Sequence, residues 1–173
     1  MLERILQWLP VDMKKKVLLA IDLEAPASWA ASYAVQLAAR LELSLVLMAI
    51  LAVPRPRPAT EKKVLSMAGL QEEQRLWLGK IRERCQQEGV EVEIFISAGS
   101  FCEEVLRFAK AQSALQFIIM GFPGDYQAGG LECSQSALQS LRRQLEGEIL
   151  LVRGQGKVMR LTDNSGQRQG REN

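Results

Sequence analysis

The feature that most constrains the fold is a short apolar run, Phe117 to Met120, which stops at Gly121 and is followed by Gly124. A continuous apolar run bounded by glycine is typical of a central strand that is buried on both faces of a parallel sheet. The two glycines allow backbone amides to come close to a phosphate, at the start of the helix that follows. The alternative is that both glycines only form a turn.

Four similar runs lie along the chain, and segments with a helical spacing of apolar residues separate them. The predicted strands are residues 17–22, 43–53, 90–97, 117–120 and 148–153. The predicted helices begin near Pro26 and then cover residues 61–88, 101–112 and 135–146. Strand, helix and strand in close succession form a βαβ unit, which requires parallel pairing and a right-handed crossover. The pattern therefore predicts a three-layer α/β domain with five parallel strands.

Both ends of the chain differ from this central domain, which we place at residues 14–153. Residues 1–13 are predicted to contain a short amphipathic helix that ends at Pro10, with apolar residues at Leu2, Ile5, Leu6 and Leu9. We expect this helix to dock on protein, either on its own domain or on a partner chain. Residues 154–173 are rich in Gly, Gln and Arg, and they are predicted to be a flexible basic tail.

Composition argues against several classes of protein. The chain has no histidine, so the commonest general base and the commonest metal ligand are both missing, and we expect no enzyme. The net charge of +2 gives no case for nucleic acid, and no apolar run is long enough to cross a membrane.

Cys85, Cys102 and Cys133 are an odd number without CxxC spacing, which indicates neither a disulfide framework nor a zinc site. This cysteine usage predicts a reducing, cytoplasmic location. A reactive thiolate at Cys102, near a predicted helix start, or at Cys133 is an alternative to buried, inert thiols.

Asp22 ends the first predicted strand. In open parallel sheets, ligands bind beyond the carboxyl ends of the strands, where the strand order reverses. An acid there can accept hydrogen bonds from a ribose hydroxyl or a base amino group, while a glycine loop faces phosphates. The alternative is an acid that only terminates the strand or caps a helix. The sequence has neither a Walker A motif nor GxGxxG, so the commonest nucleotide-binding patterns are absent.

The segments VLLAID, GVEVEIFISAG, IIMGFPG and EILLVR, together with the alanine-rich first helix, resemble the universal stress protein family over residues 14–153. The resemblance implies a five-stranded parallel sheet in the order 3-2-1-4-5, of the adenine-nucleotide alpha-hydrolase-like type. The first and fourth strands would then be neighbours. Electron-transfer flavoproteins are a more distant alternative among adenine-binding α/β folds.

Members of the family that bind ATP carry a loop of the form Gly-x2-Gly-x9-Gly-Ser/Thr. Gly121 and Gly124 match its first half, but no glycine stands before the serines near its second half. Pro123 removes one amide from the loop, and Glu24 would repel a triphosphate. The adenine-nucleotide site that the resemblance implies comprises Asp22, Ile50, Met120, Gly121, Gly124, Ser134 and Ser136.

Two functions follow from this pattern. The first is a stress-related interaction module with a degenerate nucleotide loop and no cofactor, which forms a homodimer and has a protein partner that the sequence does not identify. We expect this dimer to form through the strand at residues 148–153, as an exposed edge to which a second chain can add. The alternative is a universal stress protein that binds ATP or AMP, with magnesium. Of these two functions, the sequence favours the interaction module.

Overall fold

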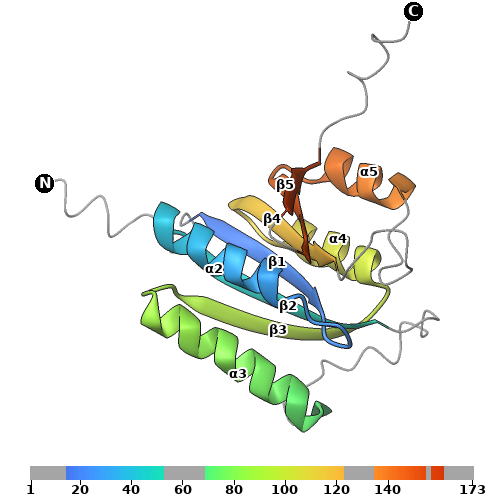
Figure 1. Cartoon of the computed structure of the whole chain (residues 1–173). Helices are drawn as coiled ribbons and strands as arrows, with labels where there is room; N and C mark the ends of the chain where they lie inside the picture. Colours follow the sequence, from blue (N-terminus) through green and yellow to red (C-terminus); the bar gives the residue numbers. More distant parts are fainter. Residues whose placement is uncertain (1–14, 53–68, 123–134, 155–156, 162–173) are drawn as a thin grey trace, which may run out of the picture.

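A sheet of six strands, in the order β3-β2-β1-β4-β5-β6, forms the centre of the computed structural model (Figure 1). The structure describes residues 15–52, 69–122, 135–154 and 157–161. The strands are β1 (Lys16–Asp22), β2 (Ser44–Ala52), β3 (Val92–Gly99), β4 (Leu115–Phe122), β5 (Glu148–Arg153) and β6 (Lys157–Arg160). The helices are α2 (Ser28–Leu41), α3 (Glu72–Gln87), α4 (Phe101–Ala111) and α5 (Gln135–Gln144).

The first five strands are parallel and confirm the predicted order 3-2-1-4-5. β1 lies at the centre of this order because the chain crosses over from β3 to β4 on the far side of β1. Asp22 pairs with Ile50 on β2, and Ala20 pairs with Met120 on β4. The carboxyl ends of β1, β2 and β4 therefore meet at one end of the sheet.

Helices cover both faces of the sheet, which gives the three layers that the alternating pattern predicts (Figure 1). α2 and α3 pack on one face, where the strands contribute residues such as Leu19 and Ile119. α4 and α5 pack on the other, where the strands contribute residues such as Leu18 and Met120. Successive side chains of a strand point to opposite faces, so each buried strand supplies both cores.

β6 is the main departure from the predicted fold. It lies inside residues 154–173, which the sequence predicts to be a flexible tail, and it pairs antiparallel with β5. The pairing is supported by a hydrogen bond from the Leu161 amide to the Ile149 carbonyl, and by an ion pair between Arg160 and Glu148. Val158 and Met159 are the apolar residues of this short strand, and they pair with Val152 and Leu151 on the edge of β5. The prediction that β5 is an exposed edge is therefore wrong.

The start of α3 also differs from the prediction of a helix over residues 61–88. α3 begins at Glu72 because Gln71 caps it, with the Gln71 amide donating to the Gln74 side chain at 3.1 Å. Its C-terminal end agrees with the prediction. Gly89 has a φ of +70°, a conformation that favours glycine after the last helical turn.

The amphipathic helix predicted within residues 1–13 lies outside the described residues, as do residues 53–68 and 123–134. Among the helices that the structure does describe, none combines the length and the apolar content needed to cross a bilayer.

Candidate functional site

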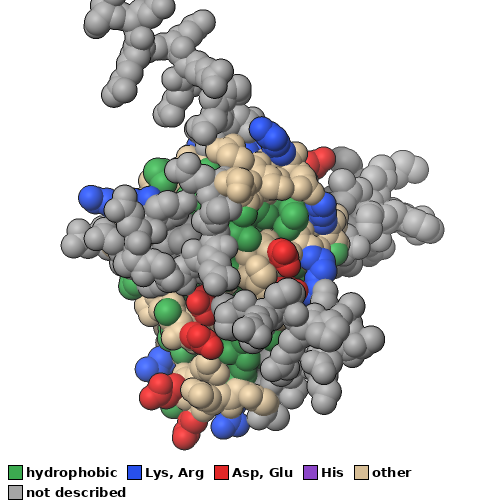
Figure 2. All heavy atoms as spheres, turned by 90° about the vertical axis from the view of Figure 1, so that its right-hand side faces the viewer, with side chains coloured by type: hydrophobic (Ala, Val, Ile, Leu, Met, Phe, Trp, Pro, Cys, Tyr) green, Lys and Arg blue, Asp and Glu red, His purple; other side chains and the backbone are tan. Residues whose placement is uncertain are grey.

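The candidate site is the end of the sheet where β1, β2 and β4 finish. Figure 2 looks onto this side of the molecule and shows acidic, basic and hydrophobic side chains between the grey segments. Asp22 is the last residue of β1, and Leu23 continues from it with an amide that donates to the Ile50 carbonyl at 2.9 Å. This bond holds the β1–α2 turn against the end of β2, which fixes where the Asp22 carboxyl group lies.

The Asp22 side chain is largely enclosed, with 7% of the residue exposed. Its Oδ1 accepts a hydrogen bond from the Glu24 amide at 3.0 Å. Burial raises the pKa of the carboxyl group above its ordinary value; the Glu24 amide lowers the pKa, and the nearby Glu24 carboxylate raises it. The Asp22 carboxyl group therefore accepts a hydrogen bond within the β1–α2 turn. Its burial disfavours the ionised form.

Ile50 and Met120 lie on the same face of the sheet as Asp22, the face that α4 and α5 cover. Strand alternation places Asp22 on the side of Leu18 and Ala20, which belong to that core. Ile50 and Met120 are both fully buried. They form the apolar floor beneath this end of the sheet, and their side chains are not at the surface.

Gly121 points to the opposite face, toward α2. A Cβ atom at this position would lie 2.6 Å from the Cβ atoms of both Ala27 and Ala30. The sequence predicts that Gly121 gives a ligand access to the backbone, and the structure shows a different use. The missing side chain lets the first turn of α2 lie directly on β4, which explains why a glycine follows the apolar run.

The structure tests only part of the implied site. Asp22, Ile50 and Met120 come together on one face, whereas Gly121 faces the other. Gly124 and Ser134 lie outside the described residues. Ser136, which matches the Ser/Thr position of the loop when one more residue is allowed, lies near the start of α5 and is exposed.

Glu104 is a buried acid outside the predicted site. It lies in the first turn of α4 with 5% of the residue exposed, and its carboxylate forms an ion pair with Arg107. A Cβ atom at Gly99, which has a φ of +155°, would meet Glu104 Oε1 at 2.9 Å. The signal is present in the sequence, since Glu104 and Arg107 are three residues apart on a helix.

The cysteines also differ from expectation. Cys102 is disulfide-bonded, whereas Cys85 is free, so the expectation that the cysteines form no disulfide is wrong for Cys102. Cys102 is thus not the free thiolate that the sequence analysis considered at the start of α4. Cys85 is buried in α3, and burial raises the pKa of its thiol. A raised pKa lowers the thiolate fraction, so Cys85 has the properties of an inert core residue.

Comparison with known proteins agrees with this fold. The model of the universal stress protein family matches residues 13–153. No curated protein shows significant similarity in sequence.

Solved structures resemble the chain over most of its length. A universal stress protein family member from Burkholderia pseudomallei has a TM-score of 0.50 and 22% identity, and the match covers 83% of this chain and 98% of that one. UspA from Lactobacillus plantarum has a TM-score of 0.53 and 17% identity, with 80% and 97% covered. A universal stress protein in complex with cAMP has a TM-score of 0.52 and 15% identity, with 82% and 98% covered. At these identities the likeness shows the fold.

Proposed function

Because the chain belongs to the universal stress protein family, we propose that it is a regulatory interaction module of that family that functions without a bound nucleotide. The observation that carries this proposal is Gly121. In a phosphate cradle the missing side chain of the glycine would make room for the ligand, whereas here the room on the Cβ side of Gly121 is taken by Ala27 and Ala30. Asp22 supports the same conclusion, since it is enclosed and already accepts a hydrogen bond from its own turn.

Binding of ATP or AMP, with magnesium, is the second candidate function. A structural neighbour was solved in complex with cAMP, and Asp22 of this chain stands at the strand end where an adenosine acceptor is expected. The described residues fit such a group in part. Asp22 would accept hydrogen bonds from the nucleoside, but the Cβ side of Gly121 is turned toward α2 and filled by Ala27 and Ala30. Glu24 would place a second negative charge near them.

Nucleotide content of the purified protein tests this proposal. The full chain, purified without added ligand, is denatured, and the supernatant is separated by ion-exchange chromatography. We expect adenine nucleotide well below one per chain, and no heat when ATP and magnesium are titrated into the native protein. A stoichiometric peak that disappears in Gly124→Val, but persists in the control Gly79→Ala, would overturn the proposal. Gly79 is a suitable control because no atom lies within 4 Å of a Cβ added there.

We further propose that the chain forms a homodimer through β6. Because β6 covers β5, it is now the strand at this edge of the sheet. Val158 and Met159 are 38% and 46% exposed, so each face of β6 carries an exposed apolar side chain. A second copy of β6 would continue the ladder and place side chains of its own beside Val158 on one face and beside Met159 on the other.

The alternation of the ladder gives a specific test for this dimer. Since the Leu161 amide bonds to Ile149, the amides of Met159 and Lys157 face β5, and those of Val158 and Arg160 face outward. Val158→Pro therefore removes an outward donor without breaking the β5–β6 ladder. We expect light scattering to give a monomer mass for Val158→Pro and a dimer mass for the control Val158→Thr. A dimer in both variants would place the interface elsewhere.

We propose no catalytic activity for the chain. The sequence lacks histidine. Among the described residues, no three Asp, Glu or Cys side chains lie close enough together to hold a metal ion. The chain would then act in regulation by binding a partner protein through its surface. Hydrolysis of ATP by the full chain, lost in Asp22→Ala, would contradict this part of the proposal.

A further inference from the structure

A groove lies at the end of the sheet opposite to Asp22, where β4 and β5 begin and where α4 and α5 end. It consists of two adjoining cavities of about 390 Å³ and 620 Å³. The residues that line both cavities are Ser113, Ala114, Leu115, Glu146 and Gly147. Sites for small ligands usually measure about 300–1,000 Å³, so the groove is large enough to hold several side chains. Neither the family relationship nor the proposed function accounts for it.

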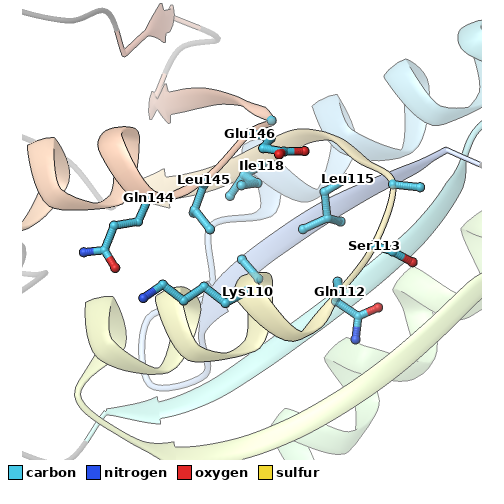
Figure 3. A pocket seen from close by; sticks show the side chains of 11 residues that line it. Lys110, Gln112, Ser113, Leu115, Ile118, Gln144, Leu145 and Glu146 are labelled. Carbon is cyan, nitrogen blue, oxygen red and sulfur yellow. The ribbon is translucent and has the colours of Figure 1, made fainter.

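The groove has an apolar floor and a charged rim. Figure 3 shows Leu115, Ile118 and Leu145 around the cavity, with Lys110 on one side of them and Glu146 above. Ile118 and Leu145 are buried, and Leu115 is partly exposed. An apolar floor between charges of opposite sign suits an amphipathic segment, which would place its apolar stripe inward and its charges at the rim.

We propose that this groove receives residues 1–9 of the same chain. The position of Lys15 is the first reason, because Lys15 lines the larger cavity together with Leu115 and Gly147. The segment thus joins the described structure in the wall of the groove. Its apolar residues are Leu2, Ile5, Leu6 and Leu9, which share one stripe at helical spacing.

The lengths are compatible with docking in the same molecule. Residues 10–14 can span at most about 17 Å when extended, which is enough to turn back from Lys15 across the groove. Residues 1–9 as a helix would be about 13 Å long. Pro10 suits the boundary between the two, since a helix usually ends at or before the residue that precedes proline.

Charge and tethering favour this occupant over others. Glu3 and Arg4 can pair with Lys110 and Glu146, the opposite charges at the rim of the groove. A segment joined by a short linker is present at an effective concentration in the millimolar range. A second copy of the chain, or a separate partner, would have to compete against that concentration.

Hydrogen exchange in the full chain tests the proposal from the side of the segment. Leu6→Glu places a charge in the apolar stripe, and Gln7→Glu adds the same charge beside it on the polar side. We expect amides of residues 109–118 and 144–148 to exchange about tenfold faster in Leu6→Glu, because burial of one leucine is worth at least that factor. Gln7→Glu should exchange as the unchanged chain does. Equal exchange in all three proteins would overturn the proposal.

A second variant tests the proposal from the side of the groove. Ser113 lines both cavities and is exposed, so Ser113→Trp can fill the groove without disturbing the core. We expect faster exchange of residues 1–9 in Ser113→Trp but not in Gln86→Trp, a substitution at an exposed site on α3. Protection of the groove that falls when the unchanged chain is diluted would instead identify a second copy as the occupant. That result would overturn docking within one chain.

Discussion

Helix α2 on one face of the sheet and helices α4 and α5 on the other pack through side chains of very different size. On the face of α2, small residues (Gly121, Ala27, Ala30, Ala34 and Ala38) let the helix lie close to the strands. On the face of α4 and α5, large residues (Met48, Met120, Phe101, Leu138 and Leu141) fill a wider space. The first face is thus sensitive to added atoms and the second to removed atoms, because both are packed without spare volume.

The largest effect is expected from Met120→Ala on the α4 and α5 face. Met120 is fully buried between these helices and the sheet, so its truncation leaves a cavity. We expect a loss of about 2–5 kcal/mol in the free energy of unfolding, measured by urea denaturation. Met120→Leu keeps most of the volume and should cost less than about 1.5 kcal/mol. Similar losses in the two variants would mean that this core tolerates cavities.

The next effect is expected from Gly121→Ala on the α2 face. The added Cβ would lie 2.6 Å from two helix side chains, so α2 must move outward. We expect a loss of about 1–3 kcal/mol in the free energy of unfolding. The control Gly79→Ala adds the same methyl group to an open helix position, and it should gain about 0.5–1 kcal/mol.

A double mutant sharpens this result. Ala30→Gly removes one of the two atoms that the new methyl group would meet. The pair Gly121→Ala and Ala30→Gly should therefore be less destabilised than the sum of its two single variants. Strict additivity would show that close contact with Ala30 does not explain the cost.

The smallest effect on stability is expected from Asp22, a buried carboxyl group on the α4 and α5 face. Burial raises the pKa of Asp22 in the folded state, so folding favours the protonated carboxyl group. This stabilisation is present below the unfolded pKa and is lost as the pH rises through the folded value. Asp22→Asn keeps an acceptor for the Glu24 amide without carrying a charge.

The stability of Asp22→Asn should exceed that of the unchanged chain slightly at pH 7. The difference should shrink as the pH falls through the raised pKa of the folded state, and it should level off below the unfolded pKa. Urea denaturation of both proteins at several pH values measures it. A difference in stability that grows on acidification would show that the pKa of Asp22 is lowered, not raised, in the folded state.

The sequence predicts the strand order because five apolar runs alternate with helical segments, and because the family resemblance supplies the order 3-2-1-4-5. It predicts the bounds of β5 correctly, since Glu148 and Arg153 flank an unbroken apolar run. It does not predict β6, because two apolar residues among charges carry too little signal until the edge of β5 is known.

Gly121 is part of the nucleotide site that the family resemblance implies, and the structure departs from this expectation for a related reason. A glycine after a strand indicates close approach, but the sequence does not say whether a ligand or a helix comes close. Only the distances to Ala27 and Ala30 decide between the two. Asp22 at the strand end is predicted correctly, whereas its bond to the Glu24 amide depends on the turn that follows.

The pairing of β6 with β5 has a consequence for the order of folding. The other ladders join strands that are separated by a long crossover, and such contacts form slowly. β5 and β6 are neighbours in the chain, and hairpins form within about 1–10 μs. We therefore expect β5 to have its outer edge covered before it reaches β4. During synthesis, the outer edge of β5 would then seldom be open to pairing with strands of other chains.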